Sequence, residues 1–209
     1  EDILTNQNYI SKGIVLDKLI ESLIVSKIDI NDIIVGDKNA LLIASRVLGY
    51  GKDYKFKAYS KQSNELKEFN IDLTLLKDKL LSKKNLKEVG INEFDFTLPH
   101  TNKLITFKIL THGDEKLIDK EIAGQNKIRP GSNPEITTRL KYVITSIDGD
   151  SEKKTIREFV DNYLLARDAR SLREEIRRIS PDIDLKYIGT DGEEDVTVPV
   201  GITFFWPDA

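Results

Sequence analysis

Apolar residues in the first part of the chain recur at spacings of three and four, which places them on one face of a helix. In the segment 15–26 they fall at Leu16, Leu19, Ile20, Leu23 and Ile24. A second apolar run, Ala40–Ala44, predicts a central helix with Asp37 as its N-cap and Gly49 as its stop. The first block, residues 15–49, is therefore predicted to be helical.

The spacing then changes to two, which indicates strands. Tyr54, Phe56 and Ala58 alternate with polar residues, and so do Phe69, Ile71 and Leu73. This pattern predicts a hairpin over 53–73. A second alternation around the turn Pro99–Asn102 predicts a hairpin over 93–110, and the Lys-rich stretch Leu75–Val89 between the two is predicted to be helical.

Residues 112–180 are predicted to form three helices. Thr111 is expected to cap a helix over 113–123, Asn133 with Pro134 to open a helix that runs to Ile147, and Ser151 to begin the longest helix, which ends before Pro181. Alternating residues then predict a C-terminal hairpin over 183–206. The expected fold is α+β, with helical blocks interrupted by β-hairpins in a single interlocked domain over 1–209.

Composition narrows the function classes. Of the 209 residues, 39% are hydrophobic and 32% charged, which is typical of a globular protein. No apolar run approaches the roughly 18 residues that span a bilayer, and no secretion signal is recognisable. The net charge of −3 disfavours a generic nucleic-acid binder. The absence of cysteine excludes disulfides and thiolate-bound metals, so we expect no cofactor.

The sequence contains few residues in patterns that are typical of a catalytic site. The two histidines, His100 and His112, lie in a turn and at a helix entry, where we expect surface or capping roles. Asp114 and Glu115 are carboxylates that a hydrolase could use, but they also fit the first turn of a helix, where negative charge is favourable. The Gly49–Lys52 segment lacks the spacing of a phosphate loop. We therefore expect no enzyme.

Two other features have competing interpretations. The arginines Arg167–Arg178 form either a solvated, ion-paired helix face or a docking surface, since arginine is enriched at interfaces. The aromatic tail Phe204-Phe205-Trp206 either packs into the core or anchors a partner. Arg139 and Asp168 lie beside apolar stripes and are predicted to form a buried ion pair.

Several of these segments, taken in order, resemble baseplate hub and hub-assembly chaperone proteins of T4-type contractile-tailed phages. The resemblance extends from Val15 to Pro207 and rests on the ordered combination, because no single element is specific. The matching segments are Val35–Arg46, Gly49–Tyr54, Leu98-Pro99, Phe107–Thr111 with Asp114-Glu115, Thr138–Leu140, Arg167-Asp168 with Leu172-Arg173, Pro181–Asp184, and Pro199-Val200 before Phe204–Pro207.

One departure from that family concerns a metal. Its members often carry two C-x-x-C pairs, which resemble a zinc ribbon with four thiolates. The first pair falls here on Ser60 and Ser63, and the second on Ile188 and Asp191. These side chains cannot form a structural zinc site. The resemblance therefore implies a metal-free pair of hairpins that still meet in space.

The resemblance implies a non-enzymatic baseplate protein that binds other hub or wedge proteins, in the virion or in the host cytoplasm during assembly. It could form an oligomer within the baseplate; no membrane or nucleic-acid partner is expected. The predicted contact residues are Arg167, Arg170, Arg173, Arg177, Phe204, Phe205 and Trp206. The alternative is a cytoplasmic adaptor with a degenerate zinc ribbon that binds nucleic acid weakly through the first hairpin. Its lysines Lys52–Lys67 would contact phosphates and Tyr54 and Phe56 would stack on bases.

Overall fold

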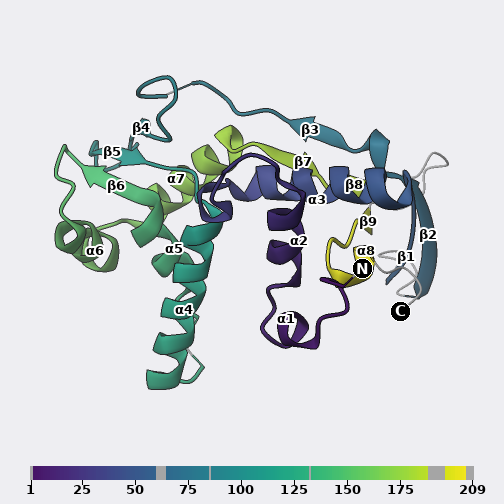
Figure 1. The fold of residues 1–209 in the computed structure, drawn as a ribbon. Helices are drawn as coiled ribbons and strands as arrows, with labels where there is room; N and C mark the ends of the chain where they lie inside the picture. Colours follow the sequence, from purple (N-terminus) through teal and green to yellow (C-terminus); the bar gives the residue numbers. More distant parts are fainter. Residues whose placement is uncertain (1, 60–64, 85, 132, 188–195, 206–209) are drawn as a thin grey trace. The chain divides into compact units, whose positions relative to one another are not determined.

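The computed structural model describes residues 2–59, 65–84, 86–131, 133–187 and 196–205 (Figure 1). Its helices and small antiparallel sheets confirm the predicted α+β class. Residue contacts group the chain into two compact units: unit 1 comprises 1–30, 36–80 and 181–209, and unit 2 comprises 31–35 and 81–180. Each unit combines segments that are distant in sequence, and the single interlocked domain stays a prediction.

Unit 1 contains the first helices, the first hairpin and the C-terminal segment. The bounds of its elements are α1 Gln7–Ser11, α2 Val15–Leu23, α3 Val35–Tyr50, β1 Asp53–Tyr59, β2 Leu66–Asp72, η2 Leu73–Leu75, β3 Lys77–Lys79, β7 Asp182–Asp184, β8 Lys186–Tyr187, β9 Val196–Thr197 and α8 Ile202–Phe205. A short 3₁₀ turn, η1 (Ile30–Asp32), lies where the chain passes into unit 2. Helix α3 begins two residues before the predicted N-cap Asp37, which lies in its first turn.

The β1–β2 hairpin confirms the prediction from alternation. Tyr54 is paired with Ile71 and Phe56 with Phe69, and these four side chains are buried. The stacked Phe56 and Phe69 rings lie 5.6 Å apart. Because successive strand residues point to opposite faces, the lysines between these positions are exposed.

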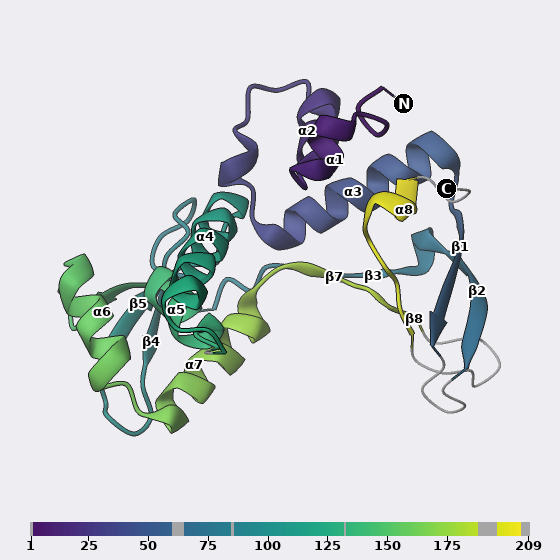
Figure 2. The same ribbon diagram turned by 90° about the horizontal axis from the view of Figure 1, so that it is seen from below.

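The predicted helix over 75–89 is wrong. This stretch instead contains β3, which pairs antiparallel with β7, placing Lys77 opposite Asp184 and Lys79 opposite Asp182. The C-terminal hairpin is also shorter than predicted, because β8 and β9 pair over two residues each and Phe204 and Phe205 lie in the helical turn α8 (Figure 2). The first error arises because β3 and β7 pair across more than 100 residues, which no local pattern indicates. The second arises because the alternation of apolar residues did not distinguish the helical turn α8 from a strand.

Unit 2 is built around a three-stranded antiparallel sheet in the order β4-β5-β6. The bounds of its elements are β4 Phe94–Thr97, β5 Leu104–Phe107, α4 His112–Ile128, α5 Glu135–Val143, β6 Ile144–Ile147, α6 Lys153–Asn162 and α7 Ala166–Ile179. The hairpin over 93–110 and the Thr111 cap are confirmed. Thr111 Oγ1 accepts from the Asp114 N–H, and the Asp114 carboxylate accepts from the Thr111 N–H in return.

All three predicted helices of unit 2 are wrong in extent. The helix predicted over 113–123 runs on to Ile128. The helix opened by Pro134 ends at Val143, because Ile144–Ile147 pair with β5 as a third strand. Its start is nearly as predicted: Asn133 Oδ1 accepts from the Glu135 N–H. The long helix over 151–180 is two helices, since the chain turns at Tyr163 and becomes extended at Leu165.

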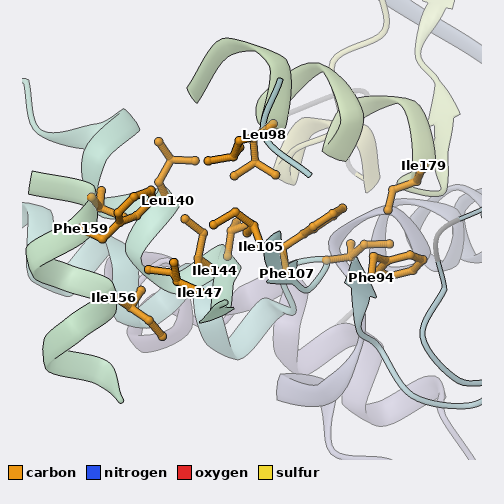
Figure 3. Packing of buried hydrophobic residues seen from close by; sticks show 14 residues of the cluster. Phe94, Leu98, Ile105, Phe107, Leu140, Ile144, Ile147, Ile156, Phe159 and Ile179 are labelled. Atoms are coloured by element: carbon orange, nitrogen blue, oxygen red, sulfur yellow. The ribbon is translucent and has the colours of Figure 1, made fainter. Parts of the chain in front are cut away.

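The core of unit 2 joins the sheet to α5, α6 and α7 (Figure 3). The strands contribute Phe94, Ile105 and Phe107, and the helices contribute Leu140, Phe159, Leu172 and Ile179 among others. Phe94 and Phe107 stack with their ring centroids 5.6 Å apart. This packing fixes the inward face of each helix, so the outward residues have defined positions.

Candidate functional site

Helix α7 presents the arginines predicted as contact residues. Its inward side chains Asp168, Leu172 and Ile179 are fully buried. Its outward side chains are exposed arginines, at positions 167, 170, 173, 177 and 178. Because α-helical residues three, four and seven apart share a face, Arg170, Arg173 and Arg177 form one stripe. We call these five residues the arginine face.

Asp168 holds the start of α7 against the β4–β5 turn. Its Oδ1 accepts from the His100 N–H at 2.9 Å, and its Oδ2 accepts from the Thr101 N–H and hydroxyl at 3.1 and 2.9 Å. Burial alone would raise the pKa of Asp168, but these hydrogen bonds outweigh it and hold the pKa below its ordinary value. A charged carboxylate therefore closes the turn, which orients α7 on the sheet.

The predicted ion pair between Arg139 and Asp168 is not formed. Arg139 instead binds Glu115 at 2.6 Å and Glu135 at 3.2 Å, while Asp168 serves the turn. Asp114 and Glu115 occupy the first turn of α4, where Asp114 also binds Lys108. These carboxylates thus hold a helix cap and ion pairs.

The arginine face is ordered by bonds within α7. Arg170 Nε lies 2.9 Å from Glu174, Arg178 Nε lies 2.9 Å from Glu175, and Arg173 Nε donates to the Ala169 carbonyl at 3.3 Å. The hydrogen bond from Arg170 lowers the pKa of Glu174. Exposed pairs of this kind contribute little stability. Their main effect is to pre-order the guanidinium groups.

The arginine face carries a surplus of positive charge. Its five guanidiniums stand against Glu174 and Glu175, a local charge of +3 in a chain whose net charge is −3. Arg170, Arg173, Glu174 and Arg177 line a shallow open hollow. A guanidinium is a planar fork of donors that binds a carboxylate through two parallel hydrogen bonds. The arrangement is suited to an acidic protein surface.

Phe204 and Phe205 of the aromatic tail do not form a surface anchor. Phe204 and Phe205 are 0% and 2% exposed, and their rings meet edge to face at 5.3 Å. Phe204 also packs on Tyr54 of the first hairpin at 4.8 Å. Both phenylalanines are therefore part of the core of unit 1, and the prediction that they contact a partner is wrong. Trp206 lies outside the described residues.

The degenerate zinc positions Ser60, Ser63, Ile188 and Asp191 also lie outside the described residues. Over the ranges that the structure covers, no three His, Cys, Asp or Glu side chains gather in a way that could hold a metal ion. The first hairpin does contact the C-terminal segment, since the Tyr54 hydroxyl lies 3.3 Å from the Pro199 carbonyl.

The nucleic-acid alternative loses its stacking platform. Tyr54 and Phe56 are 2% and 7% exposed, with their faces against other core side chains. Base stacking needs an accessible ring face. The two residues that this alternative assigned to base stacking are therefore buried, although Tyr59 is 70% exposed on the outer face of β1 beside the lysines.

Sequence analysis missed a polar cleft in unit 2, which is about 390 Å³ in volume. Its cationic lining residues are Lys108, Lys141, Lys153 and Arg157. They come from three separate segments, namely the residue after β5, helix α5 and helix α6, so no local spacing marks them as a group. Near the cleft, Arg157 binds Glu121 through both guanidinium nitrogens at 2.7 and 2.8 Å.

No protein-family model, curated protein or solved structure matches this chain. No helix within the described ranges is both long and apolar enough to cross a bilayer.

Proposed function

We propose that this chain is a non-enzymatic protein of a phage tail baseplate, a hub component or a hub-assembly chaperone that acts by binding other hub or wedge proteins. Its place would be the virion or the host cytoplasm during assembly. The ordered resemblance of segments from Val15 to Pro207 supports the phage assignment. The arginine face supports action by binding.

The observation that best supports action by binding is that the arginine face is both exposed and held in place. Asp168, Leu172 and Ile179 fix the inner side of α7, and bonds along the helix order the outer side. Binding to such a pre-ordered surface immobilises fewer side chains, which lowers the entropic cost of association. The partner surface would carry carboxylates that pair with the arginines.

The test is a charge reversal on the arginine face. Arg173→Glu changes the charge by two units at an exposed position, and Lys120→Glu makes the same change at an exposed position of α4. Tagged wild-type and variant chains would capture baseplate proteins from infected cells, with the bound partners identified and titrated. We expect Arg173→Glu to weaken binding about tenfold or more, as at an interface hot spot, and Lys120→Glu to change it less than twofold.

Two results would count against the proposal. Equal binding by both variants would remove the arginine face as the contact surface. Capture of no baseplate protein by the wild-type chain would remove the phage assignment. Quantitative mass spectrometry of mature particles then separates the two roles: a fixed low copy number indicates a resident subunit, and presence in the lysate alone indicates a chaperone.

A further inference from the structure

The polar cleft of unit 2 is formed where α4, α5, β6 and the start of α6 meet. Lys108, Lys141, Lys153 and Arg157 contribute cationic groups to its lining, and Asp114 contributes the one carboxylate among the described lining residues. Ser151 and Thr145 add hydroxyl groups. The lining is therefore rich in hydrogen-bond donors of positive charge.

Three of the cations are already positioned by carboxylates. Lys108 Nζ lies 2.8 Å from Asp114, and Lys141 Nζ lies 2.6 Å from Asp161. Arg157 is held by Glu121. Each ammonium keeps further N–H donors beyond its one partner. The Lys141 side chain is only 10% exposed.

The fourth cation, Lys153, lies at the first position of α6. The N-cap residue of this helix is Glu152, but its side chain makes no capping hydrogen bond, and the first turn carries Lys153 and Lys154 with no acidic residue. No ion pair of Lys153 is found within the ranges that the structure covers. Cations at a helix N-terminus oppose the helix dipole, and the first N–H groups there need acceptors. An anion in the cleft would supply both missing partners.

Thr145 gives an independent indication. It is the extra residue of a β-bulge, because Ile144 pairs with Phe107 and Ser146 with Thr106. Its hydroxyl oxygen is buried and has no hydrogen-bond partner among the described atoms. Bulges that re-aim a side chain are common beside binding sites, and an unpaired buried hydroxyl is costly. The α4 end of the cleft differs, since the Thr111–Asp114 capping box already closes it.

We propose that this cleft binds a phosphate group, either inorganic phosphate or the phosphomonoester of a small molecule. A phosphate carries close to two negative charges and offers three or more acceptor oxygens. Those oxygens match the donors that line the cleft, namely Lys108, Lys141 of α5, and Lys153 and Arg157 of α6. A carboxylate offers two oxygens in one plane and one charge, so it would satisfy fewer of them. The site lies apart from the arginine face residues and does not depend on the proposed function.

The test is a titration with inorganic phosphate, using the full chain at fixed ionic strength with chloride as the replaced salt. We expect a saturable rise in Tm, since a ligand that binds only the folded state stabilises it. Lys153→Ala should raise the half-saturating phosphate concentration at least fivefold. Lys154→Ala removes the same charge from the next residue, which does not line the cleft, and should raise it less than twofold.

Titrations with two other anions identify the source of the phosphate and exclude a general effect of anions on Tm. Saturation by O-phosphoserine as well as by phosphate indicates a phosphomonoester ligand, whereas a response to inorganic phosphate alone indicates the free ion. Acetate should give no saturable rise. The proposal is overturned if phosphate acts no differently from chloride, if acetate acts as well as phosphate, or if the two lysine variants weaken binding equally. Circular dichroism of both variants checks that each is folded.

Discussion

The approach of α3 to the segment before β7 gives the sharpest test of the fold of unit 1. Gly36, in the first turn of α3, lies against the backbone at Pro181. A Cβ added at Gly36 would lie 2.0 Å from the Pro181 carbonyl oxygen, 2.7 Å from its carbonyl carbon and 3.1 Å from the Asp182 Cα. These are backbone atoms, so no side-chain rotation can relieve the contact. Only glycine permits this approach.

Gly36→Ala is therefore expected to destabilise the chain. Overpacking a filled site costs typically about 1–3 kcal/mol, and contact with backbone favours the upper end. Helix propensity acts in the opposite direction by at most about 1 kcal/mol. The net expectation is a loss of about 2 kcal/mol, because the upper end of the clash cost exceeds the gain in helix propensity by about that amount. Helix α3 would have to move from Pro181, which also strains the hydrogen bond from Asn39 to Asp182.

The assay is urea unfolding followed by circular dichroism, with Gly124→Ala as the matched control. Gly124 lies inside α4, and nothing lies within 4 Å of an added Cβ there. The control should gain about 0.5–1 kcal/mol from helix propensity. A Gly36→Ala chain as stable as wild type, or stabilised like the control, would refute the close approach of α3 to Pro181.

Two further predictions concern buried and paired acids of unit 2. In the wild-type chain the His100 and Thr101 N–H groups both donate to the Asp168 carboxylate. Asp168→Asn puts an amide NH₂ in place of one carboxylate oxygen, so we expect the free energy of unfolding in urea at pH 7 to fall by about 1–3 kcal/mol. Hydrogen bonds from Arg157, acting against partial burial, lower the pKa of Glu121 to about 2 from 4.5. The ionised Glu121 therefore contributes its full share to the free energy of unfolding above about pH 4.5, and this contribution is lost as the pH falls towards 2. The stability difference between wild type and Glu121→Gln should therefore narrow between pH 5 and pH 2.5, and a constant difference would contradict the assigned pairing.

Local patterns predicted those elements whose cause is local. The alternation at Tyr54 and Phe56 identified the first hairpin, and Thr111 identified the start of α4, because strand faces and helix caps are set by neighbouring residues. The pairing of β3 with β7 had no such mark: all three residues of β3 are exposed, and their partners lie more than 100 positions away. The break between α6 and α7 contains neither glycine nor proline. Because the apolar stripe continues across it, the sequence predicted one helix instead of two.

The same distinction explains what was predicted of the candidate sites. The arginines of α7 were assignable to one exposed face because helical spacing alone separates them from Leu172 and Ile179. The aromatic tail was not assignable, since a phenylalanine pair suits a core and an interface equally until its neighbours are known. Phe204 is buried because it packs on Tyr54, which lies 150 residues earlier in the chain. The cations of the cleft could not be grouped without knowing how three separate segments pack together.

Stability and binding are separable in unit 2 because different faces of the same helices serve them. The inward residues of α6 and α7, such as Ile156 and Leu172, belong to the core around β4–β5–β6, whereas Lys153 and Arg173 point outward and are exposed. Exposed substitutions away from caps and networks usually change stability by no more than about 0.5 kcal/mol. Lys153→Ala and Arg173→Glu should thus leave the urea midpoint close to that of wild type while each affects its own ligand. A phosphate response that survives Arg173→Glu, together with partner binding that survives Lys153→Ala, would establish two independent surfaces on one core. Loss of both responses in either variant would instead trace them to a shared change in folding.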